Sequence, residues 1–177
     1  MKTSNKTKIT NLVYAAVCLA LCLVLPFLTG QLRQVGNALC PMHIPVLLAG
    51  FLCGPWWALA VGLIAPLLRH TLFLMPPLMT AIAMSFELAA YGMISGLMYR
   101  KLPKTTGNIY VSLLTAMAGG RVIWGIARLA LTGVTGKPFT FAMFLAGAFT
   151  SAIPGIIVHI LLIPVLVMAL KKANIIK

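Results

Sequence analysis

Long apolar runs that contain almost no charged residues are the feature that most restricts how this chain folds. Hydrophobic residues make up 61% of the 177 residues and charged residues only 8%, whereas a typical soluble domain has about 25% charged residues. A membrane-crossing helix needs about 20 apolar residues, and within a bilayer only helices and closed barrels satisfy every backbone hydrogen bond. The chain is therefore predicted to be an all-α integral membrane protein with no separate soluble domain.

Six apolar segments are separated by stretches rich in Gly, Pro and polar residues. They predict a single transmembrane domain over residues 1–177, a six-helix transmembrane bundle with helices at 9–29, 43–53, 56–75, 78–99, 109–132 and 141–170. Residues 43–75 are too few for two full crossings of about 20 residues each. We therefore expect the second helix to be short or tilted.

The positions of Lys and Arg predict the orientation of the bundle. If all six segments cross, one face of the membrane receives Lys2, Lys6, Lys8, Arg100, Lys101, Lys104, Lys171, Lys172 and Lys177. Only Arg33 and Lys137 fall on the opposite face. Cytoplasmic loops are enriched in Lys and Arg, so both termini are predicted to be cytoplasmic. The net charge of +13 then reflects topology and not nucleic-acid binding, because no basic face with interleaved aromatic residues lies outside lipid.

Four charged residues fall inside the predicted helices: Arg69, Glu87, Arg121 and Arg128. A charge at the centre of a membrane helix costs about 2.5 to 3.5 kcal/mol on insertion scales, so each is a functional candidate. Glu87 and Arg121 each lie 12 residues from the predicted cytoplasmic end of their helix, or roughly 18 Å at the helical rise. The matched depths predict an ion pair, which either pins two helices together or contributes to a binding site.

Arg69 and Arg128 have no acidic partner, because Glu87 is the only acidic residue in the chain. Both lie toward the outer ends of their predicted helices. Each either snorkels to the membrane interface or meets an anionic group of a ligand. Arg128, Trp124 and Arg121 share one helix face.

The neighbours of these charges extend the predicted site. Gly120 and Gly125 lie on the same face as Trp124 and are expected to leave open volume. Tyr91 lies one turn from Glu87 and adds a hydroxyl. We therefore expect a pocket of cations, one acid and aromatic residues that opens to the outside.

No motif in the sequence indicates an enzyme. His-Glu-x-x-His, Gly-x-Ser-x-Gly and Walker sequences are absent, and a single carboxylate cannot support a paired-carboxylate mechanism. His43, His70 and His159 are scattered without metal-ligand spacing, and we interpret His159 as a hydrogen-bonded bundle residue. We expect no enzymatic activity, no cofactor and no metal site.

A resemblance to a known family rests on several features together. The first helix carries Ala16-x-x-x-Ala20, a small-residue pattern that permits close helix approach, either within the bundle or to another protein. The size, the six predicted helices, the cytoplasmic termini, this alanine pattern and the stretch MHIPVLLAGFLCGP at residues 42–55 resemble the substrate-binding S components of energy-coupling factor (ECF) transporters. The resemblance covers essentially the whole chain and is to the branch that contains riboflavin and pantothenate carriers.

That family implies a multi-pass protein of the bacterial cell membrane that binds a vitamin from outside, using the outer loops and the outer halves of helices four to six. The pocket predicted above falls in this region, and the predicted substrate-binding residues are Glu87, Tyr91, Arg121, Trp124, Arg128, Asn37 and Arg69. The excess of Arg over acid favours an anionic vitamin, with pantothenate as the first choice and a riboflavin- or pyridoxine-type compound as the alternative. The first helix is implied to dock, at Ala16 and Ala20, on a membrane scaffold (T) subunit driven by two ATPase subunits.

Two functions of other classes stay open from the sequence. A self-sufficient small oligomeric transporter or channel moves its substrate without partner subunits. A membrane assembly factor binds no transported ligand.

Overall fold

The computed structural model describes residues 2–29, 39–136, 139–148 and 150–176, and these residues form helices and connections without any strand. The α-helices are α1 (Lys2–Val24), α3 (His43–Leu52), α4 (Pro55–Phe73), α5 (Leu78–Lys101), α6 (Thr106–Thr135), α7 (Phe141–Ala148) and α8 (Ile153–Lys172). Two short 3₁₀ helices, η1 (Leu25–Thr29) and η2 (Thr150–Ala152), follow α1 and precede α8. The predicted all-α fold is confirmed.

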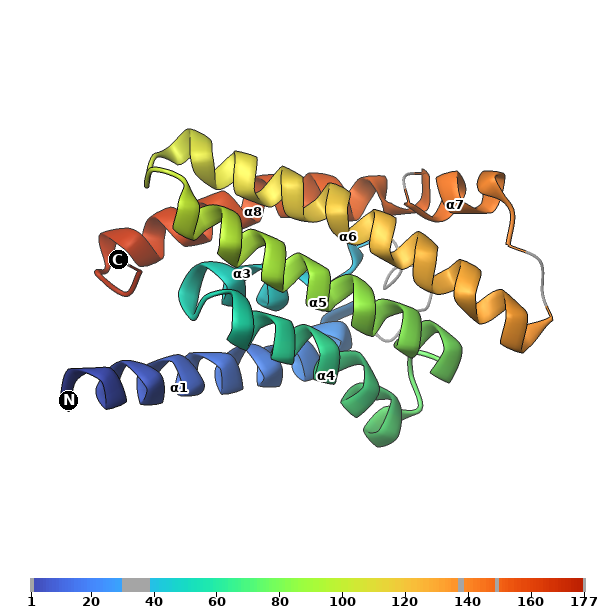
Figure 1. The fold of residues 1–177 in the computed structure, drawn as a ribbon, viewed down its shortest axis with the longest axis horizontal. Coiled ribbons are helices and arrows are strands. Elements are labelled where there is room, and N and C mark those ends of the chain that lie inside the picture. Colours follow the sequence, from blue (N-terminus) through green and yellow to red (C-terminus); the bar gives the residue numbers. More distant parts are fainter. Residues whose placement is uncertain (1, 30–38, 137–138, 149, 177) are drawn as a thin grey trace.

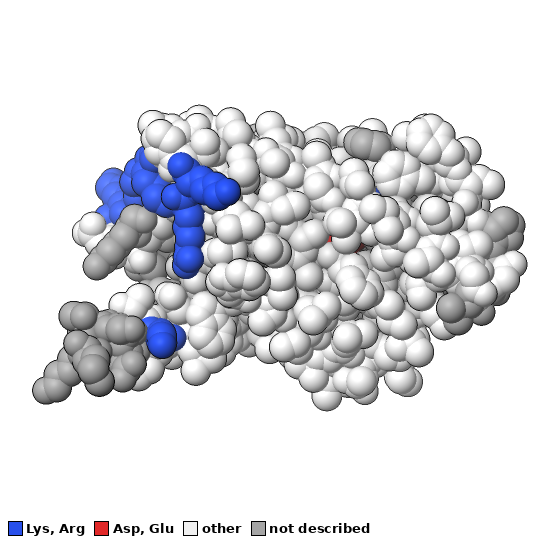
Figure 2. Space-filling view, in the orientation of Figure 1, with Lys and Arg blue, Asp and Glu red and all other residues white. Residues whose placement is uncertain are grey.

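The long helices lie alongside one another and share the long axis of the molecule (Figure 1). Both chain ends and the α5–α6 connection lie at one end of this axis, while the α4–α5 and α6–α7 connections lie at the other (Figure 1). Figure 2 shows that Lys and Arg gather at the end with the termini. The Lys and Arg side chains that the structure describes at this end are exposed: Lys8, Arg100, Lys101, Lys104, Lys171 and Lys172. Arg33, Lys137 and Lys177 lie outside the described residues, as do the side chains of Lys2 and Lys6.

The basic end is held together by bonds to backbone oxygens. The Lys171 Nζ donates to the Lys104 carbonyl at 2.6 Å and the Lys104 Nζ donates to the Tyr99 carbonyl at 2.7 Å. Partial burial, with Arg100 and Lys171 nearby, lowers the pKa of the Lys104 amino group below its ordinary value. This end therefore carries positive charge that no described acidic side chain neutralises, because Glu87 lies within α5.

Within the described residues, five helices are long and apolar enough to cross a membrane: Thr7–Leu28, Pro55–Phe73, Leu78–Lys101, Thr106–Gly133 and Ile153–Lys172. The second predicted helix is α3, which is apolar but has only 10 residues. At the helical rise it spans about 15 Å, half of a hydrocarbon core of about 30 Å. The expectation of a short second helix is met, and α3 by itself does not make a sixth complete crossing.

The last predicted helix is wrong as a single element. The structure divides residues 141–170 into α7 and α8, with η2 between them. Pro154 occupies the first turn of α8, where the missing amide hydrogen costs nothing, whereas within a continuous helix the same ring would break a hydrogen bond. Pro154 therefore marks the start of a separate helix.

Other helix ends follow local signals. The Thr105 hydroxyl accepts from the Asn108 amide at 3.4 Å and starts α6 three residues before the predicted position. Gly136 ends α6 in the left-handed region, with φ of 65°, a conformation that glycine adopts without steric cost.

Small residues allow α3 and α4 to pack closely against α5. A Cβ built on Gly50 of α3 would lie 2.9 Å from the Gly92 carbonyl oxygen, and one on Gly62 of α4 would lie 2.4 Å from the Leu88 carbonyl oxygen. Helix association in membranes depends on such small-residue contacts. Because His43 neighbours Glu87 and Gly50 neighbours Ser95, α3 runs in the same direction as α5 and begins at the depth of Glu87.

Candidate functional site

The Glu87–Arg121 ion pair predicted from the sequence is confirmed. Glu87 of α5 and Arg121 of α6 approach to 2.9 Å between Oε1 and Nη1. The Glu87 side chain is 2% exposed and the Arg121 side chain 12%. Glu87 and Arg121 lie at the same depth because α5 and α6 are adjacent and antiparallel, so residues equally far from their connection lie side by side.

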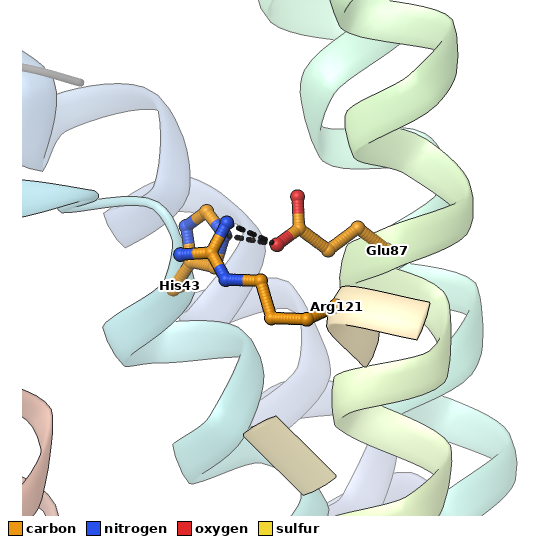
Figure 3. Close-up of polar contacts among 3 residues, drawn as sticks. All are labelled: His43, Glu87 and Arg121. Carbon is orange, nitrogen blue, oxygen red and sulfur yellow. Dashed lines mark ion pairs between the residues drawn. The ribbon is translucent and has the colours of Figure 1, made fainter. Parts of the chain in front are cut away.

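His43 is a further neighbour of the Glu87 carboxylate that the sequence analysis did not assign to the site. It is the first residue of α3, and its Nε2 lies 3.5 Å from Glu87 Oε1. Figure 3 shows the three side chains converging from α3, α5 and α6. The N-terminus of α3 therefore directs the positive end of its helix dipole toward the only carboxylate side chain.

Tyr91 and His159 complete a buried cluster around the ion pair. The Tyr91 hydroxyl hydrogen-bonds to the Glu87 carboxylate. The His43 ring lies 5.2 Å from the Tyr91 ring and 5.9 Å from the His159 ring, between centroids. We call His43, Glu87, Tyr91, Arg121 and His159 the polar cluster. It joins α3, α5, α6 and α8 in the middle of the bundle.

One expectation about open volume in this region is wrong. A Cβ on Gly120 would lie 2.1 Å from the Tyr91 ring, and a Cβ on Gly125 would lie 2.6 Å from the Phe144 ring. Aromatic side chains fill both spaces. The two glycines therefore permit close packing of these aromatic rings and leave no open volume.

Trp124 and Arg128 form a second group, in the part of α6 that lies away from the basic end. The Arg128 guanidinium lies 5.9 Å from the centre of the Trp124 ring and 5.8 Å from that of Phe139. Phe139 meets Trp124 edge-on at 5.8 Å, and Phe144 lies 6.2 Å from Trp124. We call Trp124, Arg128, Phe139 and Phe144 the aromatic cluster. Arg128 is half-buried, and cation–π contacts hold its guanidinium against the bundle.

Arg69 joins neither cluster. Its side chain is 3% exposed, and its Nη1 donates to the Leu23 carbonyl in the last turn of α1. Its guanidinium lies 5.0 Å from the Phe27 ring centre and 5.2 Å from that of Phe73. A guanidinium placed between two rings and a helix-end carbonyl is neither snorkelling nor directed at the polar cluster. It connects the C-terminal ends of α1 and α4.

Ala16 and Ala20 both lie on the exposed face of α1. The same face carries exposed apolar side chains at Leu12, Val13 and Val17. Packing of the two alanines inside the bundle, the alternative left open by the sequence, is therefore wrong. Asn37, the remaining predicted site residue, lies outside the described residues.

His43 and His159 are buried beside the ion pair and have ring nitrogens that are not fully hydrogen-bonded. Among the described residues, His43 Nδ1, His43 Nε2 and His159 Nε2 are buried and lack a hydrogen-bond partner of normal geometry. The only signal was that His43 is the second residue of the 42–55 stretch, two residues after Pro41, and nothing local marked His159. No group of three or more His, Cys, Asp or Glu among the described residues is arranged to hold a metal ion.

The comparison with known proteins adds one finding. A family model described as "ECF transporter, substrate-specific component" matches residues 10–167. Neither a curated protein nor a solved structure matches the chain. The matched range includes the polar cluster, the aromatic cluster and the exposed alanines of α1.

Proposed function

Because this chain belongs to the family of ECF transporter substrate-specific components, we propose that it is the high-affinity vitamin-binding subunit of an ATP-driven importer in the bacterial cell membrane. In this role it captures an extracellular vitamin and docks on a scaffold (T) subunit with two ATPase subunits. It performs no chemistry on the vitamin. The family match is the observation that carries the proposal.

The charge distribution supports a bundle with both termini in the cytoplasm. The exposed Lys and Arg side chains of the described residues gather at the end that holds both chain termini (Figure 2). Basic residues favour the cytoplasmic side. With this orientation the aromatic cluster lies in the outer half, where an extracellular substrate arrives.

We place the vitamin against the polar cluster and the aromatic cluster. A buried ion pair costs desolvation energy and is rarely kept for stability alone, so the Glu87–Arg121 pair supports a functional site. Among the described residues, the Arg128 guanidinium contacts only the rings of Trp124 and Phe139. An anionic vitamin, with pantothenate as the first choice, would pair with this guanidinium. A riboflavin- or pyridoxine-type compound is the alternative.

The docking surface that we propose is the exposed face of α1 around Ala16 and Ala20. Small side chains on an exposed membrane helix permit a second helix to approach closely. Their exposure supports a contact with another subunit, because the bundle itself does not use them.

Mass spectrometry of the purified protein tests the proposal most directly. A carrier with a Kd of 1 nM holds its ligand with about 12.3 kcal/mol and retains it through purification, so a vitamin is expected in the spectrum. Reconstitution in liposomes is the second arm: we expect tight binding by the protein alone and uptake only with the scaffold, the ATPases and ATP. Uptake by the isolated protein would favour a self-sufficient transporter or channel. Absence of any bound or stabilising vitamin would favour an assembly factor.

A further inference from the structure

The polar cluster contains more buried hydrogen-bonding capacity than its own residues use. His43 and His159 are 2% and 3% exposed, and three of their ring nitrogens lack a hydrogen-bond partner among the described residues. An unsatisfied buried polar atom costs about 1 to 3 kcal/mol, and native proteins rarely leave several together. Their position beside the Glu87–Arg121 pair points to a ligand group that satisfies them.

The neighbours of each ring determine which nitrogen carries the proton. The His159 ring bonds the backbone carbonyl of Cys40, and since Nε2 is the unpaired atom, the donor is Nδ1. The His43 Nε2 faces the Glu87 carboxylate at 3.5 Å, which favours the proton on Nε2. In a neutral imidazole the other nitrogen is then an acceptor. The two rings therefore present acceptors at His43 Nδ1 and His159 Nε2.

The charge balance of the cluster restricts what fills this position. Arg121 is paired with Glu87, the only acidic residue of the chain, so the cluster is neutral when both imidazoles are neutral. An anion would compete with Glu87 for Arg121, and a cation would face Arg121 without a carboxylate of its own. Because uncompensated charge within a membrane protein is costly, an uncharged donor fits best.

We propose that His43 Nδ1 and His159 Nε2 bind the inner end of the substrate by accepting hydrogen bonds from its uncharged hydroxyl or N–H groups. This inference rests on the proposed function and names the substrate class. Arg128 lies seven residues further along α6 than Arg121, or about 10 Å at the helical rise. The substrate is thus a molecule with an anionic group at its outer end and, about 10 Å away, an uncharged end that carries hydrogen-bond donors.

The test compares matched probes on the purified protein. Pantothenate, riboflavin and pyridoxine are each titrated and followed by Trp fluorescence or calorimetry. The tightest binder is then compared with its deoxy analogues, in which one hydroxyl at a time is replaced by hydrogen. For the hydroxyls that meet the histidines, we expect each replacement to weaken binding roughly fivefold, as for one neutral hydrogen bond.

The variants His43→Phe and His159→Phe keep an aromatic ring and remove the acceptor. Each variant is expected to bind the parent compound more weakly than the unmodified protein does. Its affinity for the corresponding deoxy analogue should equal that of the unmodified protein. His159→Gln restores an acceptor and should recover part of the discrimination. His70→Phe is the matched control, because the His70 ring bonds the Pro76 backbone near the outer end of α4, away from the cluster.

The outcomes separate this inference from the proposed function. Binding of a probe with equal affinity for parent and deoxy analogue, or unchanged discrimination in both Phe variants, would overturn the inference and leave the vitamin-binding role intact. If the Phe variants bind the parent and the deoxy analogue more weakly by the same factor, the inference is likewise overturned. That result would mean that the two histidines have only a structural role. Failure of the unmodified protein to bind any of the three probes would overturn both proposals.

Discussion

Glu87 Oε1 lies 2.9 Å from Arg121 Nη1, and this contact joins α5 to α6 where α3 begins. The pair places the only acidic residue of the chain against one of several arginines. Because His43 lies against the same carboxylate oxygen, a change at Glu87 affects three helices at once. The stability of the bundle and the geometry of the candidate site are therefore coupled.

Removal of one partner of this pair is expected to destabilise the protein strongly. Glu87→Gln and Arg121→Met should each lower the free energy of unfolding by about 3 to 5 kcal/mol, because the remaining group is left buried and uncompensated. The double variant should recover a large part of this loss. Thermal or denaturant unfolding in detergent provides the measurement. If each single variant is as stable as the unmodified protein, the ion pair does not form in the membrane protein.

Arg128 is expected to bind the anionic group of the substrate. Arg128→Ala should weaken the binding of pantothenate by more than about 1.5 kcal/mol, the lower limit for a hydrogen bond to a charged group, as measured by calorimetry. Arg128→Lys keeps the charge but loses the planar contacts with Trp124 and Phe139, so an intermediate loss is expected. Unchanged affinity in both variants would mean that Arg128 only packs against the two rings.

Larger side chains at the exposed alanines of α1 should block docking without affecting binding. Ala16→Leu and Ala20→Leu are expected to lower ATP-driven uptake by the complete transporter at least tenfold, about 1.4 kcal/mol of docking free energy, while the vitamin affinity of the isolated subunit stays the same. Ala130→Leu is the matched control, since Ala130 is also exposed but lies on α6. Uptake that survives both α1 substitutions would place the docking surface elsewhere.

Close packing of α3 on α5 should be sensitive to a single methyl group. Gly50→Ala would place a Cβ 2.9 Å from the Gly92 carbonyl oxygen, and overpacking of this kind costs about 1 to 3 kcal/mol. Displacement of α3 would also move His43 from Glu87, so vitamin affinity should fall together with the unfolding temperature. Gly107→Ala is the control, because its added Cβ has no atom within 4 Å beyond its chain neighbours and the nearby backbone of its own helix. Equal stability of both variants would contradict the tight α3–α5 contact.

The Glu87–Arg121 ion pair could be predicted from the sequence. Helix positions, the helical rise and the requirement to neutralise a buried charge were sufficient to place Glu87 beside Arg121, because α5 and α6 follow each other along the chain. The same reasoning failed for Gly120 and Gly125, since the residues that occupy their space, Tyr91 and Phe144, come from other helices. It failed for Arg69 for a similar reason: its partners are in α1, η1 and the end of α4.

The sequence by itself determined that this chain enters a membrane as a helical bundle, which end of the helices is basic, and which buried charges pair, because hydrophobicity, charge and helical rise act along the chain. The structure alone decided that α3 is a half-length helix whose first residue reaches Glu87, that His159 faces His43, and that Arg69 fastens α1 to α4. These contacts join residues far apart in sequence. They depend on how closely the helix backbones approach, which no local pattern of residues specifies.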